Sequence, residues 1–405
     1  MALPSTGSLS FSQIEQEFGN NNTEADEKRT LGKYRISQTV GGMSNLPLDT
    51  GIARGTSPIK FSEFRGKRLN VVVSYNTTNT GGIERATYAK EKYDDKDDIT
   101  VIGGFKDIPS DTSGSKIIIH VHNNVSLGST TLTRKHCALR TGGGWQSGTV
   151  LEINIGKNAM VSGAGGNGGN GGRPFSNAGI GYSGENGSSA IGIAFPVEKI
   201  TIQEGAIVRA GAGGGGGGGG AAGEGHPESD ERVGGAGGGG GVGIPAGLGG
   251  VAGSNSSDGG TAYGNVEEQP INGGNGSQTI GGNGGFGGLN NEGESDNTPT
   301  AQSGGGGGGG FLGEGGGSYT QLGGGNSGTG GDGNIIDAGA GEDSGKGGDG
   351  GPGDAEGSNQ EQGSGGSGGL GGYAIVTKNN APVPNVEGDG SLIGTTITHA
   401  NDFEI

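Results

Sequence analysis

Glycine is concentrated in one half of this chain, and that concentration limits what the chain can fold into. Of 405 residues, 105 are glycine, about a quarter of the chain where roughly 7% is usual. Residues 1–160 hold 19 of them, residues 161–372 hold 83, and the remaining 3 lie after residue 372. The first part therefore has the composition of a globular domain, whereas the second lacks the side chains that build a conventional core.

Two states are open to residues 161–372, because their glycine runs favour either disorder or an unusual order. Glycine loses more backbone entropy on ordering than any other residue, which favours random coil. However, apolar residues punctuate the runs, and the chain returns to a strand-like stretch at Tyr373–Val376. Extended glycine helices with three residues per turn let backbones approach closely enough to bond laterally, as at the collagen axis. We therefore expect a bundle of polyglycine II helices, similar to polyproline II, over residues 211–372.

Turns between such helices are expected where glycine becomes sparse. Five stretches meet this condition: Glu224–Val233, Ser254–Asn272, Leu289–Ser303, Asn334–Lys346 and Asp354–Gln362. These variable loops are the parts of the glycine-rich half with enough side-chain variety for recognition.

The remaining chain divides into three further regions. Residues 69–210 contain short β-branched runs separated by turn residues, which predict a β-rich scaffold with antiparallel strands. Ile153–Ile155 and Ala159–Val161 recur 47 residues later as Ile200–Ile202 and Ala206–Val208. Such a repeat predicts two equivalent β-coils stacked as neighbours. Residues 373–405 are expected to form a C-terminal strand and tail. The fold class is thus mainly β with little helix.

Residues 1–68 contain two related short phrases and are expected to dock onto another protein. Ser10 and Gln13 form a capping box, which predicts a short helix over 10–18. The phrase FSQI at its start returns as FSEF at residues 61–64. This segment is too small to bury a core alone, and a flexible leader is the alternative. The docking candidates are the apolar residues of the two phrases, namely Phe11, Ile14, Phe18, Phe61 and Phe64.

Charge and cysteine content exclude several classes of function. The net charge is −17, and the glycine-rich half carries the negative excess, so binding to nucleic acid or to an anionic membrane is not expected. Cys137 is the single cysteine, so no disulfide forms within the chain. We find neither a signal peptide nor an apolar stretch long enough for a transmembrane helix.

Catalytic and metal-binding patterns are also missing from the sequence. No nucleophile-elbow, HExxH or CxxC pattern occurs, so we expect no enzyme and no cofactor. His120 and His122 are weak metal candidates, since residues two apart on a strand share a face and other copies of the chain would have to supply further ligands. Surface histidines are the commoner outcome. Four carboxylates in residues 94–98 suit calcium, although a solvated turn explains them better.

Two resemblances follow from these phrases. SFSQIEQEFG and IKFSEFRGK resemble a paired module near the N-termini of structural proteins of marine tailed phages, especially cyanophages. From residue 69 onward, phrases such as SKIIIHV, GTVLEINIG and AGAGGGGGGGG resemble a glycine-rich domain of phage tail proteins. The glycine-rich half is also similar to the distal tail-fibre adhesins of T-even-like phages, in which polyglycine II helices pack together and loops at the tip contact the receptor.

These resemblances imply a phage tail fibre or tail-tip protein that attaches to the host surface. Its partners would be other tail proteins, through the N-terminal segment, and a host receptor that is a protein or a glycan; a homo-oligomer such as a trimer is also expected. The chain would be assembled in the host cytoplasm and exposed on the virion. Aromatic residues supply contact area at low entropic cost, so the receptor-contact candidates are Phe175, Tyr182, Tyr263, Phe286, Phe311 and Tyr319.

Three other interpretations of the sequence stay open. These six aromatic residues would equally serve to cap the ends of the glycine bundle. The protein would alternatively be a purely structural virion component, such as a baseplate, tail or capsid fibre spacer, that binds no receptor. An ice-binding or matrix protein is a further alternative, and it predicts flat faces of one small residue type.

Overall fold

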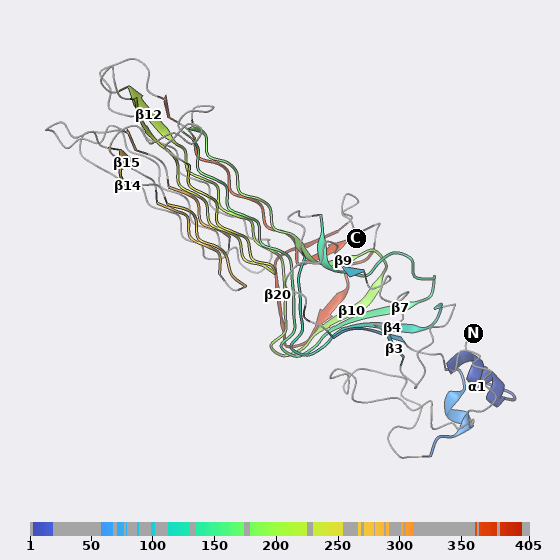
Figure 1. Cartoon of the computed structure of the whole chain (residues 1–405). Helices are drawn as coiled ribbons and strands as arrows, with labels where there is room; N and C mark the ends of the chain where they lie inside the picture. Colours follow the sequence, from blue (N-terminus) through green and yellow to red (C-terminus); the bar gives the residue numbers. More distant parts are fainter. Residues whose placement is uncertain are drawn as a thin grey trace.

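The computed structural model is elongated, with a stack of β-strands between an N-terminal module and a long array of glycine-rich segments (Figure 1). The structure describes residues 3–18, 58–67, 71–76, 78, 87–88, 99–101, 112–129, 135–173, 179–224, 230–253, 266–268, 271–278, 280–286, 289–290, 301–302, 305–310, 361–362, 364–378 and 381–398. Within these residues, no helix is long and apolar enough to cross a membrane.

Three β-sheets make up the stack. The first has the strand order β19 (Asn385–Glu387), β10 (Val197–Ile202), β7 (Val150–Ile155), β4 (Lys116–Val121), β1 (Val71–Tyr75) and β3 (Ile99–Val101). The second has the order β20 (Ser391–Ile393), β11 (Ile207–Arg209), β8 (Met160–Ser162) and β5 (Ser126–Leu127). The third has the order β2 (Thr87–Tyr88), β6 (Cys137–Arg140), β9 (Ser189–Ile193), β18 (Ile375–Thr377) and β21 (Thr396–Ile397).

The chain visits the three sheets in turn, so each circuit forms one coil of the stack. Ile153 pairs with Ile200 and Val161 pairs with Val208, which confirms that the two copies of the 47-residue repeat lie side by side. The prediction of antiparallel strands was wrong. Among the described pairs of the stack, β3 is antiparallel to β1 and the others are parallel. Parallel neighbours require a long crossover, and here the crossover is a whole coil.

The core of the stack is mainly aliphatic. The strands β4 and β7 are buried on both faces beyond their first residue, as expected for parallel sheets. The side chains with almost no exposure include Ile117, Ile119, Ile153 and Ile155. Cys137 is buried in a small separate cluster with Val376, and burial raises the pKa of its thiol, so this group is held in its neutral form.

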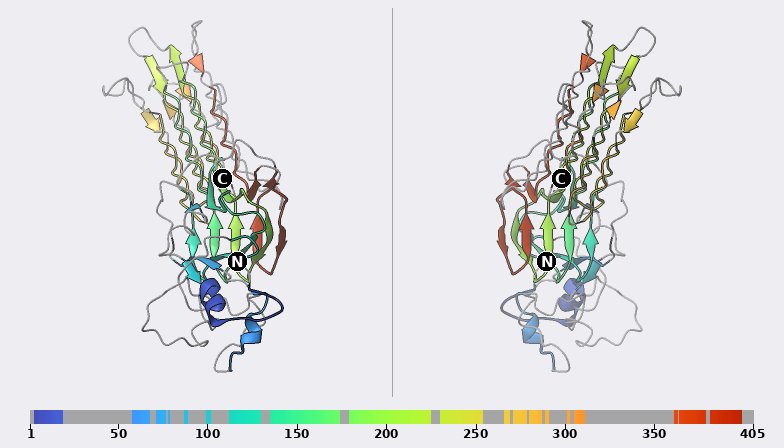
Figure 2. Two further views of the ribbon diagram at one scale, coloured as in Figure 1. Left: turned by 90° about the vertical axis from the view of Figure 1, so that its right-hand side faces the viewer. Right: turned by 90° about the vertical axis from the view of Figure 1, so that its left-hand side faces the viewer.

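The glycine-rich residues leave the stack at one corner, between the second and third sheets. One excursion connects β8 to β9, and a much longer one connects β11 to β18. The described excursions contain nine extended runs, which we call the glycine-rich segments. They are 163–172, 179–188, 211–220, 234–243, 247–253, 271–277, 280–286, 305–310 and 364–372. Two side views show them running side by side away from the stack (Figure 2).

Backbone hydrogen bonds between these segments repeat every three residues. For example, the N–H groups of Tyr182, Glu185 and Ser188 donate to the carbonyls of Asn170, Asn167 and Ala164, at 2.9, 2.8 and 2.9 Å. Segment 234–243 donates to 163–172, 271–277 and 305–310, and accepts from 211–220, 247–253 and 280–286. Segment 234–243 thus bonds to six neighbouring segments.

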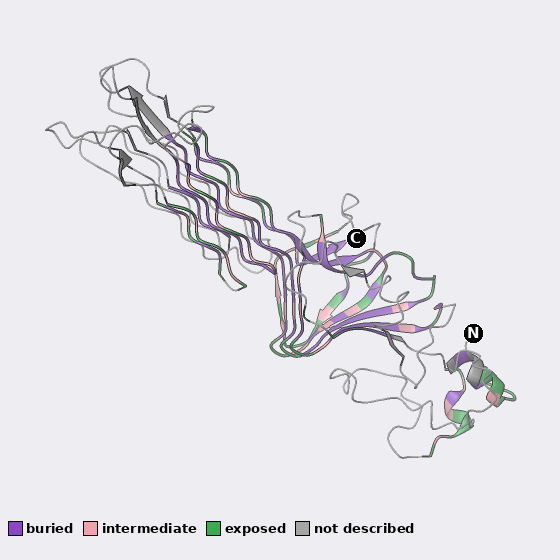
Figure 3. Cartoon of the chain, in the orientation of Figure 1, coloured by how far each residue is buried: buried purple, intermediate pink, exposed green. Residues whose placement is uncertain are grey.

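The neighbour relations arrange the described segments in three layers. The first layer holds 247–253, 163–172 and 179–188; the second holds 271–277, 234–243, 211–220 and 364–372; the third holds 280–286 and 305–310. Burial follows the layers, because 234–243 is buried throughout whereas outer segments alternate buried and exposed residues (Figure 3).

The number of glycines in a segment reflects how many of its sides pack closely against neighbouring backbones. On the outer segment 179–188, the glycines Gly181, Gly184 and Gly187 recur every third residue, and a Cβ on each would overlap a carbonyl of segment 211–220. In the central segment 234–243, an added Cβ would overlap backbone at position after position. Close backbone approach, rather than turn formation, is therefore the reason for the glycine runs.

The N-terminal module consists of α1 (Phe11–Phe18) and the 3₁₀ helix η3 (Phe61–Phe64), packed together. The predicted capping box is confirmed, since the Ser10 N–H donates to Gln13 Oε1 at 2.8 Å and the Gln13 N–H donates to Ser10 Oγ at 3.2 Å. The rings of Phe11 and Phe61 lie 6.1 Å apart. The two related phrases thus form one unit.

Candidate functional site

The far end of the glycine-rich segments is built from two small antiparallel sheets, which we call the distal tip. One sheet has the order β13 (Asp230–Val233), β12 (Ala221–Glu224) and β17 (Glu361–Gln362). The other has the order β14 (Val266–Glu268), β15 (Leu289–Asn290) and β16 (Ala301–Gln302). The sheets touch each other through β12, β13, β15 and β16. The ends of separate glycine-rich segments are therefore tied into one surface.

The predicted glycine-poor stretches adjoin this tip. The stretches beginning at Glu224 and Leu289 each enclose a β-hairpin connection, and those at 254–272 and 354–362 lead into β14 and β17. Most of their residues, and all of Asn334–Lys346, lie outside the described part of the structure. The register places Glu224 opposite Asp230. The paired strands thus fix where the connections 225–229 and 291–300 start and end.

The described receptor-contact candidates do not lie in these loops. Tyr182 is in the middle of segment 179–188 with 60% of its surface exposed, and Phe286 ends segment 280–286 with 49% exposed. Neither ring is buried as a cap on the bundle. Phe175, Tyr263, Phe311 and Tyr319 lie outside the described residues. Tyr182 as a receptor contact stays a prediction, now placed on a glycine-rich segment.

Asparagine side chains on outer segments bond the neighbouring backbone. Asn167 Oδ1 accepts from the Leu248 N–H at 2.9 Å, and Asn170 Oδ1 accepts from the Val251 N–H at 2.8 Å. On another segment, Asn275 and Asn272 accept in the same way from Gly249 and Ala252, both at 2.8 Å. Because each pair is three residues apart, the side chains satisfy N–H groups that face outward. This role was not predicted from the sequence, although asparagine recurs every third residue in the GGNGG phrases.

Removal of both asparagines at 272 and 275 is expected to loosen segment 247–253. Each Asn→Ala change removes one hydrogen bond at an exposed site, so we expect a loss of about 1 kcal/mol per bond in the free energy of unfolding. Urea unfolding of the double variant measures the loss. Ser183→Ala, at another exposed position on a glycine-rich segment, is the control and should leave stability unchanged. An equal effect of the two substitutions would contradict the role of the amides.

His120 and His122 lie together, with ring centroids 5.0 Å apart. His120 is fully buried, and the Asn154 amide bonds its Nδ1 at 2.7 Å, so it is not placed to share a metal ion with another copy. Burial also lowers the pKa of His122. Among the described residues, no three His, Cys, Asp or Glu side chains are grouped to hold a metal ion. The carboxylates of 94–98 lie outside the described residues.

The lowered pKa of His122 predicts acid sensitivity. Because the folded state favours the neutral imidazole, the full stability is present above the unfolded pKa near 6.5, and stability falls as the pH drops below that value. The midpoint of thermal unfolding, measured from pH 8 to pH 5, should decrease less steeply in His122→Gln than in the unchanged chain. Identical pH slopes for the two proteins would contradict this assignment.

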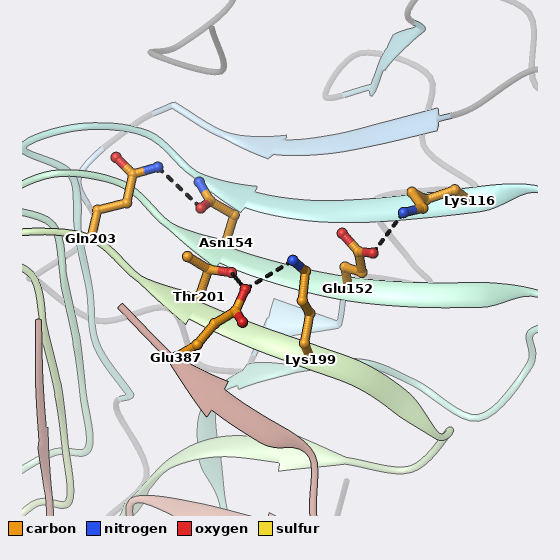
Figure 4. A network of polar contacts seen from close by, with 7 residues as sticks. All are labelled: Lys116, Glu152, Asn154, Lys199, Thr201, Gln203 and Glu387. Atoms are coloured by element: carbon orange, nitrogen blue, oxygen red, sulfur yellow. Dashed lines mark hydrogen bonds and ion pairs between the residues drawn. The ribbon is translucent and has the colours of Figure 1, made fainter. Parts of the chain in front are cut away.

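A row of polar contacts ties successive coils of the first sheet (Figure 4). Lys116 bonds Glu152 across β4 and β7 at 2.7 Å, and the Gln203 amide donates to Asn154 at 3.1 Å. Lys199 bonds Glu387 across β10 and β19 at 2.8 Å. The Glu387 carboxylate raises the pKa of Lys199, and the Lys199 ammonium lowers the pKa of Glu387. Of these contacts, the Lys199–Glu387 pair ties the last coil to the sheet.

The docking candidates divide into buried and exposed residues. Ile14 and Phe64 are fully buried, whereas Phe61 is 41% exposed and Phe11 is partly buried beside it. The side chain of Phe18 lies outside the described residues. Ile14 and Phe64 therefore build the interior of the module, and Phe61 is the candidate with a free surface.

One comparison with known proteins gives a match. Residues 103–302 match the family model described as phage tail fibre adhesin Gp38. The matched range includes the β-stack from β4 to β11 and the glycine-rich segments as far as β16. No curated protein and no solved structure matches the chain. The family match supports a phage tail fibre protein that acts in attachment to the host cell.

Proposed function

We propose that this chain is a receptor-binding adhesin in which loops at the distal tip contact the host and residues 1–68 attach the protein to the virion. The observation that carries the proposal is the arrangement of the two ends. The bases of the glycine-poor loops gather at one end of the molecule, and the N-terminal module lies at the other (Figure 1). A molecule with this shape holds its loops away from the particle. Its action is binding without turnover.

We further propose that the glycine-rich segments are polyglycine II helices. The three-residue repeat of their hydrogen bonds and their bonding to neighbours on all sides support this assignment, since three residues per turn is the geometry of the polyproline II class. Backbone bonds between segments replace a hydrophobic core. The resulting bundle is a rigid spacer that fixes the loops relative to the β-stack.

Attachment to the virion is assigned to the exposed part of the N-terminal module. Phe61 has an exposed ring that contacts Phe11, and aromatic residues are enriched at protein interfaces. The partner is another tail protein. The receptor is a protein or a glycan of the host surface, and the number of copies per fibre stays a prediction.

Competition for adsorption tests the function. Purified chain added to host cells should slow adsorption of the parent phage in proportion to the number of host receptors that it occupies. A chain with Phe61→Ala should compete equally well, because the module faces the virion, yet it should incorporate poorly into particles. Absence of competition by folded protein at saturating concentration would contradict receptor binding by this chain.

A further inference from the structure

The first layer of the glycine-rich segments has an exposed face whose side chains repeat in rungs. One rung consists of Leu248, Asn167 and Glu185, and the next consists of Val251, Asn170 and Tyr182. Each rung is fixed by hydrogen bonds, in which the Asn accepts from the backbone N–H of the aliphatic residue and its own carbonyl accepts from the third member. Three residues separate the rungs, or about 9 Å at the polyproline II rise.

In the rung of Leu248, Asn167 and Glu185, two side chains contact each other. Asn167 Nδ2 donates to Glu185 Oε2 at 2.8 Å. Asn170 and Tyr182 stand in the same relation one turn further along, since the Tyr182 N–H donates to the Asn170 carbonyl at 2.9 Å. Asn170 and Tyr182 are therefore neighbours across the two segments.

The rung of Val251, Asn170 and Tyr182 has polar groups that could bind a ligand. Tyr182 is 60% exposed, and Asn170 is exposed beside it. Within the described residues, neither the Asn170 amide nitrogen nor the Tyr182 hydroxyl has a hydrogen-bond partner. An aromatic ring with a polar tip and a neighbouring exposed amide presents one apolar surface and directed polar contacts.

We infer that this face binds a neutral oligosaccharide, with one sugar against the ring of Tyr182 and its hydroxyls bonded to Asn170 and to the Tyr182 hydroxyl. Sugars combine an apolar C–H face with hydroxyl groups that both donate and accept, which matches this set of groups. The rung spacing is comparable with a disaccharide, so Glu185 and Asn167 would contact the following unit. The carboxylate of Glu185 and the acidic glycine-rich half disfavour anionic sugars. This site is separate from the distal loops and goes beyond the proposed role of the tip.

An array of defined oligosaccharides, followed by titration calorimetry of the full chain, tests the inference. We expect a neutral oligosaccharide of two or more sugars to bind, Tyr182→Ala to weaken binding roughly tenfold or more, and Asn170→Ala to weaken it less. Tyr182→Phe should keep most of the affinity, because it preserves the ring. Phe286→Ala removes another exposed ring and serves as the matched control, with no expected change.

Separate measurements distinguish loss of this oligosaccharide site from loss of folding and from loss of recognition by the tip. Tyr182→Ala leaves the backbone bonds of segment 179–188 in place, so its thermal unfolding should match that of the unchanged chain. Two outcomes would overturn the site: no neutral glycan binds the folded protein, or binding survives Tyr182→Ala unchanged. Exchange of the distal loops should leave glycan binding by this face intact, so failure of the site and failure of tip recognition are distinguishable.

Discussion

Gly238→Ala is expected to destabilise the glycine-rich bundle by about 3 kcal/mol or more. Gly238 lies in the central segment 234–243, and a Cβ there would overlap the carbonyl of Gly215. The overlapping atoms are backbone, which has no rotamer to change, and overpacking of a close-packed interior costs about 1–3 kcal/mol before bonds are lost. The Gly238 N–H bond to Gly169 and the Gly250 N–H bond to Gly238, 2.9 and 2.7 Å long, would both be strained.

Two adjacent glycines provide the control for this prediction. A Cβ on Gly273 would overlap the carbonyl of Gly238, whereas a Cβ on the exposed Gly274 would meet its nearest atom, the Asn283 nitrogen, at 3.3 Å. Thermal unfolding and hydrogen exchange should show a large loss of protection for Gly273→Ala and a small one for Gly274→Ala. Equal tolerance of alanine at 238, 273 and 274 would contradict the close packing of these backbones.

Exchange of the distal loops is expected to change which host is bound. Replacing residues 225–229, 254–265 and 291–300 with the corresponding lengths of unrelated sequence should reduce adsorption to the original host roughly tenfold or more, because a few buried contacts carry most of the binding energy of an interface. Particle yield and incorporation of the protein should stay the same, since the segment ends are fixed by β12, β14 and β16. Adsorption assays and quantification of the protein in purified particles measure the two quantities.

The control for the loop exchange is a set of changes outside the tip. Lys157→Ala and Glu204→Ala break an exposed ion pair of 2.7 Å in the β-stack, which contributes little to stability, and they should leave adsorption unchanged. Unaltered host range after exchange of these three loops would show that recognition lies elsewhere in the chain.

The sequence predicted the coil structure because its repeat is carried by buried residues. Ile153 and Ile200 pair because each occupies the same position in adjacent coils, and aliphatic residues that recur at a fixed spacing bury one another when such coils stack. Strand direction was mispredicted, although a signal existed. The run Ile117–Ile118–Ile119 is continuous rather than alternating, and such runs are typical of parallel strands buried on both faces.

Side-chain type alone predicted the receptor-contact candidates, and it does not identify the element that carries each of them. Around Tyr182, Gly181, Gly184 and Gly187 recur every third residue. That spacing marks an outer segment whose glycines pack against one neighbouring backbone, that of segment 211–220. The period of three also predicts the roles of Asn167 and Asn170, whereas no local pattern indicates which segments become neighbours. That pairing depends on bonds between residues far apart in the chain, such as Gly366 with Gly217.

Localisation of the two ends on phage particles adsorbed to host cells tests the central claim most directly. A gold label at the N-terminus and a second label inserted within residues 225–229 can be imaged on the same particles by electron microscopy. We expect the N-terminal label at the virion and the loop label at the host surface, separated by the length of the molecule. A loop label at the virion, with the N-terminal label facing the cell, would contradict the proposed orientation.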